Sequence, residues 1–284
     1  MEEDIQNFMD NLVKYLLFEL KKRNMPVTEF NMQKLIYKIK MELGKEHELY
    51  PKLPFYWYLK GPYSEVVSKS FNNSKIFNVD NLDINSDILS FPEVGRISDE
   101  LMSDKEFFYN VLDKEIYRQY APYDFMYSYK YEIYDIAKNS DYVDFDVKVF
   151  IRKMTHCEGQ LPFNEYFNPL CLLYSEFTIY LDLINDVGNF EKNWDFLQKP
   201  IICIWKTFAK GFRVKFQDDF YSNNVKMWDC EYKDSLNDLS YLVKQTKNLI
   251  NFKEYPYKEY TPEEIKMLNA TIGSYLRGIM SSDY

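Results

Sequence analysis

The residues that could do chemistry are few, and their spacing matches no known active site. His156 and Cys157 are neighbours, but Cys/His catalysis needs a fold that places the pair beside a third, orienting group. Asp218 and Asp219 could bind a metal ion, although adjacent acids are more typical of a solvated surface. The phosphate-loop, dinucleotide, nucleophile-elbow and zinc-protease motifs do not occur in the sequence. We therefore predict no catalytic residue.

The cysteines and histidines do not form a metal-binding pattern. The four cysteines are Cys157, Cys171, Cys203 and Cys230. They show no CxxC spacing, and only two histidines are present, so we expect no zinc site and no cofactor. The thiols are typical of buried cysteines in a reducing cytoplasm. No apolar run reaches about 18 residues, and the amino terminus is acidic, so we expect neither a membrane partner nor a signal peptide.

Four lysines in the first third of the chain could contact another macromolecule. They are Lys34, Lys38, Lys69 and Lys75. Lys34 and Lys38 are four residues apart, so a helix would place them on one polar face. That face would either be solvated or contact phosphate or an acidic partner. The tyrosine-rich segment 123–134, with Lys130, could stack on bases, but its acidic surroundings favour core packing or a protein interface.

The clearest structural junction runs from Phe55 to Phe71. Residues 55–59 have high β propensity and predict a strand that ends at a turn formed by Gly61-Pro62. A short helix should follow, and Trp57 should be buried. Gly61, Pro62, Tyr63 and Ser64 are therefore predicted to be structural. Upstream, Thr28 predicts the N-cap of a helix that ends at Gly44.

These two segments carry a resemblance to known proteins. The helix contains QKLIY at residues 33–37, and the junction reads YWYLKGPYSEVV at residues 56–67. This pair resembles the amino-terminal pattern of the YwgA-like and Panacea (SocA-type antitoxin) families, over roughly residues 5–95. The resemblance implies a winged-helix-like domain and an antitoxin that neutralises a partner protein by direct contact. It also implies a role in mobile-element or defence biology.

Charge argues against a simple DNA-binding domain. A β-ribbon, the wing of a winged helix, is expected at residues 79–91. Residues 79–95 contain only acidic charges: Asp80, Asp83, Asp87 and Glu93. A wing of this charge would repel phosphate. Residues 1–78 have a net charge of +2 and the remainder has −11, which gives −9 for the whole chain.

The chain of 284 residues, 46% of them hydrophobic, is long enough for two domains. The turn signals Pro92 and Gly95 predict a winged-helix-like domain over residues 1–95 and a larger, acidic, helical domain over residues 98–284. Ser103 and Glu106 predict a capping box. Helices are expected at residues 164–187, at 236–250 and after Thr261, whereas 201–216 suits either a helix or a buried strand.

Taken together, the sequence predicts a mainly α protein with a small β-ribbon. The leading interpretation is a non-enzymatic regulatory or antitoxin-like protein of the cytoplasm that binds a partner protein. A DNA-binding transcriptional regulator that uses the four lysines is the alternative, and nucleic acid is disfavoured by the charge. A third interpretation is an enzyme in the carboxy-terminal domain, without a motif to support it.

Overall fold

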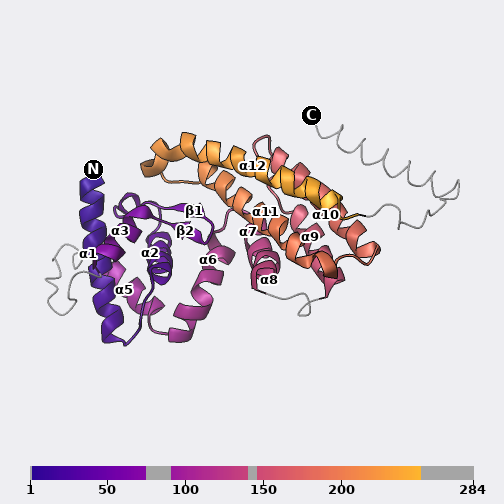
Figure 1. Cartoon of the computed structure of the whole chain (residues 1–284). Helices are drawn as coiled ribbons and strands as arrows, with labels where there is room; N and C mark the ends of the chain where they lie inside the picture. Colours follow the sequence, from indigo (N-terminus) through magenta and orange to yellow (C-terminus); the bar gives the residue numbers. More distant parts are fainter. Residues whose placement is uncertain (1, 75–90, 140–145, 251–284) are drawn as a thin grey trace.

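The computed structural model describes residues 2–74, 91–139 and 146–250, and the described chain is mainly helical with one small antiparallel sheet (Figure 1). The elements of the first half lie on one side of the molecule. They are α1 (Glu2–Lys22), α2 (Glu29–Leu43), β1 (Tyr56–Tyr58), β2 (Gly61–Tyr63), α3 (Glu65–Ser74), α5 (Pro92–Leu101) and α6 (Leu112–Tyr120). Short helical turns lie at Tyr50–Lys52 and Phe107–Val111.

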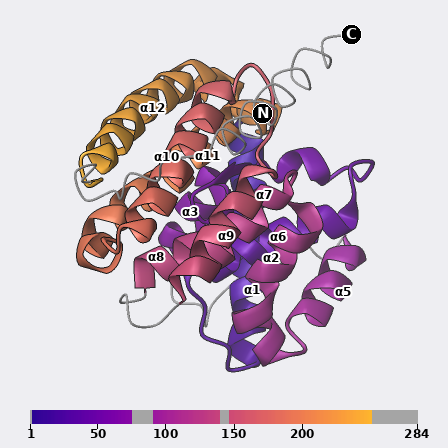
Figure 2. The same ribbon diagram turned by 90° about the vertical axis from the view of Figure 1, so that its right-hand side faces the viewer.

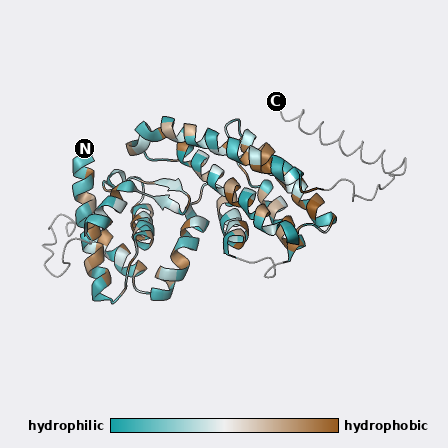
Figure 3. Cartoon of the chain, in the orientation of Figure 1, coloured by the Kyte–Doolittle hydropathy of each residue, from teal (hydrophilic) through white to brown (hydrophobic). Residues whose placement is uncertain are grey.

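The second half forms the other side, where α12 runs alongside α11 and α10 (Figures 1 and 2). Its helices are α7 (Asp124–Tyr129), α8 (Asp135–Asn139), α9 (Val147–Glu158), α10 (Asn168–Asp186), α11 (Trp194–Lys215) and α12 (Val225–Lys247). A π-helical turn, η4 (Lys130–Tyr134), joins α7 to α8, and 3-10 turns lie at Glu191–Asn193 and Asp219–Asn224. Apolar and hydrophilic residues alternate along the helices of both sides (Figure 3).

The helix ends of the first half follow from local chemistry. α1 begins with Glu2, Glu3 and Asp4 and ends with Lys21 and Lys22, a charge order that suits the helix dipole. The Thr28 N-cap of α2 is confirmed, because its hydroxyl accepts a hydrogen bond from the backbone N–H of Asn31. α2 ends at Leu43, followed by Gly44 as predicted.

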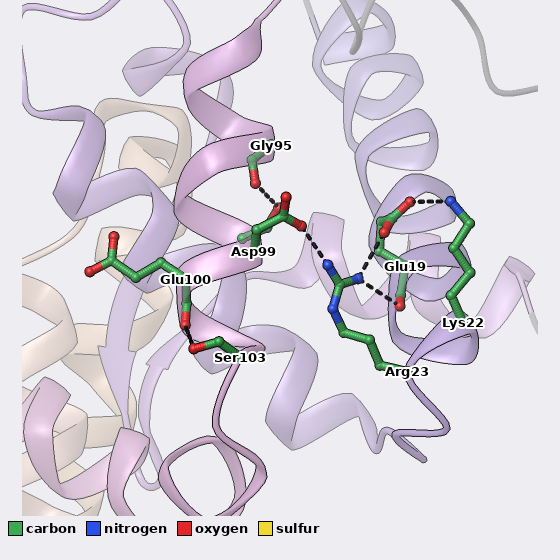
Figure 4. A network of polar contacts seen from close by, with 8 residues as sticks. Glu19, Lys22, Arg23, Gly95, Asp99, Glu100 and Ser103 are labelled. Carbon is green, nitrogen blue, oxygen red and sulfur yellow. Dashed lines mark hydrogen bonds and ion pairs between the residues drawn. The ribbon is translucent and has the colours of Figure 1, made fainter.

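Arg23 ties α1 to α5 at the surface (Figure 4). Its guanidinium lies 2.7 Å from a carboxylate oxygen of Glu19 and 2.6 Å from one of Asp99. α5 therefore packs with the first helices, and its Ile97 and Val94 belong to the same core. The predicted domain boundary, between residues 95 and 98, falls within α5. The division into two domains stays a prediction.

The hairpin differs from the predicted strand, turn and helix. Gly61 and Pro62 do not form the turn; they lie in β2, where Trp57 pairs with Pro62 and Tyr58 with Gly61. The turn is Leu59-Lys60. Gly61 has a φ of +90°, a conformation that other residues rarely adopt. This conformation lets the chain leave the two-residue turn and pair at once with β1. Helix α3 then begins after Ser64.

Residues 201–215 of the ambiguous segment belong to helix α11, and Phe216 is its C-cap. The apolar positions of the segment recur three and four residues apart, and Trp205, Phe208, Phe212 and Phe216 stack in succession, with ring centroids 6.1, 5.5 and 4.3 Å apart. The indole N–H of Trp205 donates to the carbonyl oxygen of Leu59 at 3.0 Å. α11 thereby joins the hairpin to the second half of the chain.

Three other local predictions have clear outcomes. The capping box of Ser103 and Glu106 is wrong: Asp104 accepts from the N–H groups of Glu106 and Phe107, and Ser103 donates back to the Glu100 carbonyl. Helices 164–187 and 236–250 are present with shifted bounds, as α10 and α12. The ribbon at 79–91 and the helix after Thr261 lie outside the described residues, and the winged-helix assignment stays a prediction. Within the described ranges, no helix combines the length and apolar character that a bilayer crossing requires.

Candidate functional site

Lys34 lies inside the protein rather than on a polar surface. Its side chain is 2% exposed, and its ammonium lies 3.1 Å from Oδ1 of Asp113 on α6. The ammonium also donates to the backbone carbonyl of Lys60 and lies 4.9 Å from the ring centroid of Phe30. The expectation of a solvated or phosphate-binding position is therefore wrong for Lys34.

A second buried lysine shares the same carboxylate. The ammonium of Lys130 lies 2.6 Å from Oδ2 of Asp113, and the hydroxyl of Tyr131 donates to that oxygen, also at 2.6 Å. Lys130 also lies 4.0 Å from the ring centroid of Tyr117. We call Lys34, Asp113, Lys130 and Tyr131 the lysine–aspartate cluster. It shows that this end of the tyrosine-rich segment packs in the core.

Burial controls the ionisation of the cluster. It lowers the pKa of Lys34 to about 8, with Asp113 acting in the opposite direction, and it lowers the pKa of Lys130 as well. Burial would raise the pKa of Asp113, but the two ammonium groups hold that pKa below its usual value. The cluster connects α2, the hairpin, α6 and η4 through contacts around one carboxylate and the Lys60 carbonyl.

The other predicted lysines are not brought together with Lys34 on one surface. Lys38 is 6% exposed, and its ammonium contacts Glu42 at 2.7 Å, Gln119 at 2.7 Å and the Tyr120 hydroxyl at 2.8 Å. Lys69 is exposed on α3. Lys75 lies outside the described residues.

The segment Gly61–Ser64 is held by the helix that carries QKLIY. The Gln33 side chain donates to the carbonyl of Ser64 and accepts from its N–H, both at 2.9 Å. The Ser64 hydroxyl accepts from the Val67 N–H at the start of α3 and lies 3.2 Å from the Tyr221 hydroxyl. These contacts give the two motifs of the resemblance a common structural role, since each fixes the other.

Trp57 is buried, as predicted, at 6% exposure. Its ring contacts Tyr37, Tyr117 and Phe212, with centroids 5.8, 5.2 and 6.4 Å apart. These rings come from α2, α6 and α11, so Trp57 lies where both halves of the chain meet. Pro62 is also buried, and Tyr63 is half-buried.

The residues with catalytic potential do not form a site. Burial raises the pKa of the Cys157 thiol to about 12, so its reactive thiolate is disfavoured beside His156. Asp218 has a structural role, because it accepts from Lys40 at 2.5 Å and from the Phe55 N–H at 2.6 Å. Sequence reasoning missed Lys40, which is 2% exposed. Among the described residues, no three acidic, histidine or cysteine side chains are grouped to hold a metal ion.

A cavity of about 350 Å³ lies between α2 and the hairpin, where an enzyme would need converging polar groups. It is lined by Phe30, Tyr58 and Pro62, together with Gln33 and Lys34. The polar ends of Gln33 and Lys34 are already bound by the Ser64 backbone and by Asp113. Gln33 and Lys34 are therefore engaged in holding the fold, and the other polar residues at the cavity are Glu29, Lys60, Tyr58 and Tyr63.

The feature that sequence reasoning missed is an apolar surface on and beside α10. Phe163 is 87% exposed, Leu172 71% and Ile179 58%. The opposite side of α10 packs in the core through Tyr174, Phe177 and other residues. The sequence signal for this surface was that apolar side chains occur on all sides of α10. One apolar stripe is enough for a helix to pack against a core. We call Phe163, Leu172 and Ile179 the α10 apolar surface.

No family model, curated protein or solved structure matches the chain. The resemblance to the YwgA-like and Panacea families accordingly stays a prediction.

Proposed function

We propose that this protein is a non-enzymatic regulator that acts by binding a partner protein directly, as antitoxins do. The observation that carries the proposal is the α10 apolar surface. Single exposed apolar residues are ordinary in proteins, but Leu172 and Ile179 lie seven residues apart on one face of α10, and Phe163 precedes the same helix. Covering them would remove apolar area from water, which is the main favourable term in protein association.

The placement of α10 supports the same interpretation. The helix is anchored by a fully buried face that includes Tyr174, whose hydroxyl donates to the Met154 carbonyl at 2.7 Å. Leu172 and Ile179 are therefore presented on a rigid scaffold, so a partner would pay little to order them. The antitoxin role in mobile-element or defence biology rests on the resemblance alone.

The DNA-binding alternative is weakened by the lysines it invoked. Lys34 and Lys38 are buried and paired with carboxylates, so their charges are already compensated. Of the three predicted lysines that the structure describes, Lys69 is the exposed one. A phosphate-binding surface usually combines several such charges.

A site-directed cross-linking experiment tests the proposal. A photo-reactive amino acid replaces Leu172 in one variant and Tyr241 in a control, and both variants are expressed in the native host. Tyr241 suits the control because it is a large apolar residue on α12 that is 63% exposed. We expect one discrete protein to cross-link at position 172 and not at 241.

The captured protein is then purified and titrated against three chains: wild type, Leu172→Asp/Ile179→Asp and Tyr241→Asp. The double variant should bind at least about tenfold more weakly, equivalent to about 1.4 kcal/mol, while the control binds as wild type. Equal affinity for wild type and the double variant, or a cross-link at both positions, would refute the proposed function.

A further inference from the structure

We infer that the outer face of α10 is the docking surface for a basic amphipathic helix of the partner protein. This inference rests on the proposed function and adds the chemistry of the partner. Two observations support it: the spacing of the outward residues of α10 and the acidic charge of residues 154–191. A third consideration is that a second copy of this chain would fit the same face poorly.

One row of residues on the outer side of α10 has the three-and-four spacing of a coiled-coil contact face. At alternating intervals of three and four along the helix lie Pro169, Leu172, Glu176, Ile179, Leu183 and Asp186. Leu183 is half-buried and the other five are exposed, and Asp182, next to Leu183, is exposed as well. This spacing places them in one row, which is the pattern that packs against a second helix. Four residues of the row are apolar; Glu176 lies between Leu172 and Ile179, and Asp186 lies at the end.

The charge of the segment selects a basic partner. Residues 154–191 include no Lys or Arg and six acids: Glu158, Glu165, Glu176, Asp182, Asp186 and Glu191. Within the described residues, Glu176 and Asp186 form no salt bridge, and Glu176 accepts one hydrogen bond from the Tyr180 hydroxyl at 2.5 Å. The last turn of α10 has no basic residue, so the negative end of its dipole adds to the field near Asp186.

A second copy of this chain fits the row poorly. If two α10 helices paired antiparallel about the middle of the apolar row, Leu172 would face Leu183 and Glu176 would face Ile179. Both Glu176 carboxylates would then be buried without a basic partner, because the segment supplies none. A partner helix with Leu or Ile in its seam and Lys or Arg opposite Glu176 and Asp186 satisfies both features.

The test uses two designed helical peptides with the same apolar seam of about three heptads. One has Lys at the positions that flank the seam, and the other has Glu there. Each is titrated against the full chain by fluorescence anisotropy at physiological salt. We expect the Lys peptide to bind at least about tenfold more tightly than the Glu peptide.

Charge reversal on α10 should exchange these preferences. Glu176→Lys/Asp186→Lys should favour the Glu peptide, and Leu172→Asp/Ile179→Asp should lose both peptides. Asp234→Lys/Asp238→Lys is the matched control, because it makes the same change in net charge at exposed residues of α12. It should keep the preference for the Lys peptide.

Failure of this inference is separable from failure of the proposed function. If the native partner still requires Leu172 and Ile179 but the peptides bind equally, or Glu176→Lys/Asp186→Lys behaves as the control does, the basic-helix inference is refuted and the proposed function stands. A wild-type dimer in sedimentation that Leu172→Asp dissociates would also refute it, in favour of a second copy.

Discussion

The ammonium of Lys34 lies 3.1 Å from Oδ1 of Asp113, although the two residues belong to α2 and α6. Lys130 approaches the other oxygen of the same carboxylate. The cluster therefore holds two buried cations on one anion, and we expect the three side chains to contribute unequally to stability.

Replacing Asp113 should cost more than replacing Lys34. Asp113→Asn leaves two ammonium groups without their counter-charge, and breaking a buried ion pair in this way costs about 3–5 kcal/mol. Lys34→Met leaves Lys130 and Asp113 as a balanced pair and should destabilise by less. Urea unfolding of both variants measures the difference, and an equal or reversed order would contradict the assignment of Asp113 as the shared anion.

The stability contributed by Lys34 should rise with pH above about 8. The pKa of Lys34 is lowered by burial to about 8, from the ordinary 10.5 that we assign to the unfolded chain. Between these values the unfolded chain binds more protons than the folded one, so the free energy of unfolding increases with pH. The difference between wild type and Lys34→Met should grow from about pH 7.5 to about pH 10. A constant difference across that range would show that the pKa of Lys34 is not shifted.

Gly61→Ala should destabilise the fold through a clash. A Cβ at this position would overlap Nζ of Lys34 and lie 2.9 Å from Cε2 of Tyr117. Gly44→Ala is the matched control, because Gly44 also has a positive φ, of 79°, but nothing lies within 4 Å of the place that its methyl group would take. We expect Gly61→Ala to cost about 1–3 kcal/mol more than Gly44→Ala, the range for overpacking. Equal melting temperatures would exclude the close approach.

Trp57→Ala should cost about 3–5 kcal/mol, the range for removing a large aromatic side chain from a core. Its ring lies between aromatic residues of three helices, including Phe212 of α11. Tyr241→Ala, at an exposed ring, should stay within about 0.5 kcal/mol of wild type. An unchanged melting temperature for Trp57→Ala would contradict the interpretation that this ring joins the two halves of the chain.

Duplex DNA should be bound weakly or not at all. The chain has a net charge of −9, and Lys34 and Lys38 are internal. Lys69→Glu is the informative variant, because it reverses an exposed charge without opening an ion pair of the core. Anisotropy titrations on random and native duplexes should give no sequence-specific binding at nanomolar concentration and physiological salt. Tight binding that Lys69→Glu abolishes would support the repressor alternative instead.

Much of the local structure could be predicted from the sequence. Side-chain caps and apolar spacing act within a few residues, so the Thr28 cap, the end of α2 near Gly44 and the burial of Trp57 were predictable. The turn at Gly61-Pro62 was not, because strand pairing decides whether a glycine with positive φ begins a turn or a strand. The choice of helix for 201–216 likewise depended on which rings stack.

The candidate site was predicted least well. Lys34 and Lys38 are polar residues on a helix, and local spacing alone favours a solvated face. Their partners, Asp113 for Lys34 and the side chains of Glu42 and Gln119 for Lys38, come mostly from distant positions. The sequence indicated that α10 has more apolar residues than one buried stripe needs, but it did not show that Leu172 is among those that reach solvent.

The sequence by itself determined the helical character of the chain, its uneven charge and the absence of recognised catalytic motifs, because these depend on composition and on contacts between near neighbours. Only the tertiary structure decided which lysines are buried and which face of α10 reaches solvent. Burial depends on what the rest of the chain packs against each residue. For that reason the charged Lys34 is buried and the apolar Leu172 is exposed, the reverse of what their side chains predict.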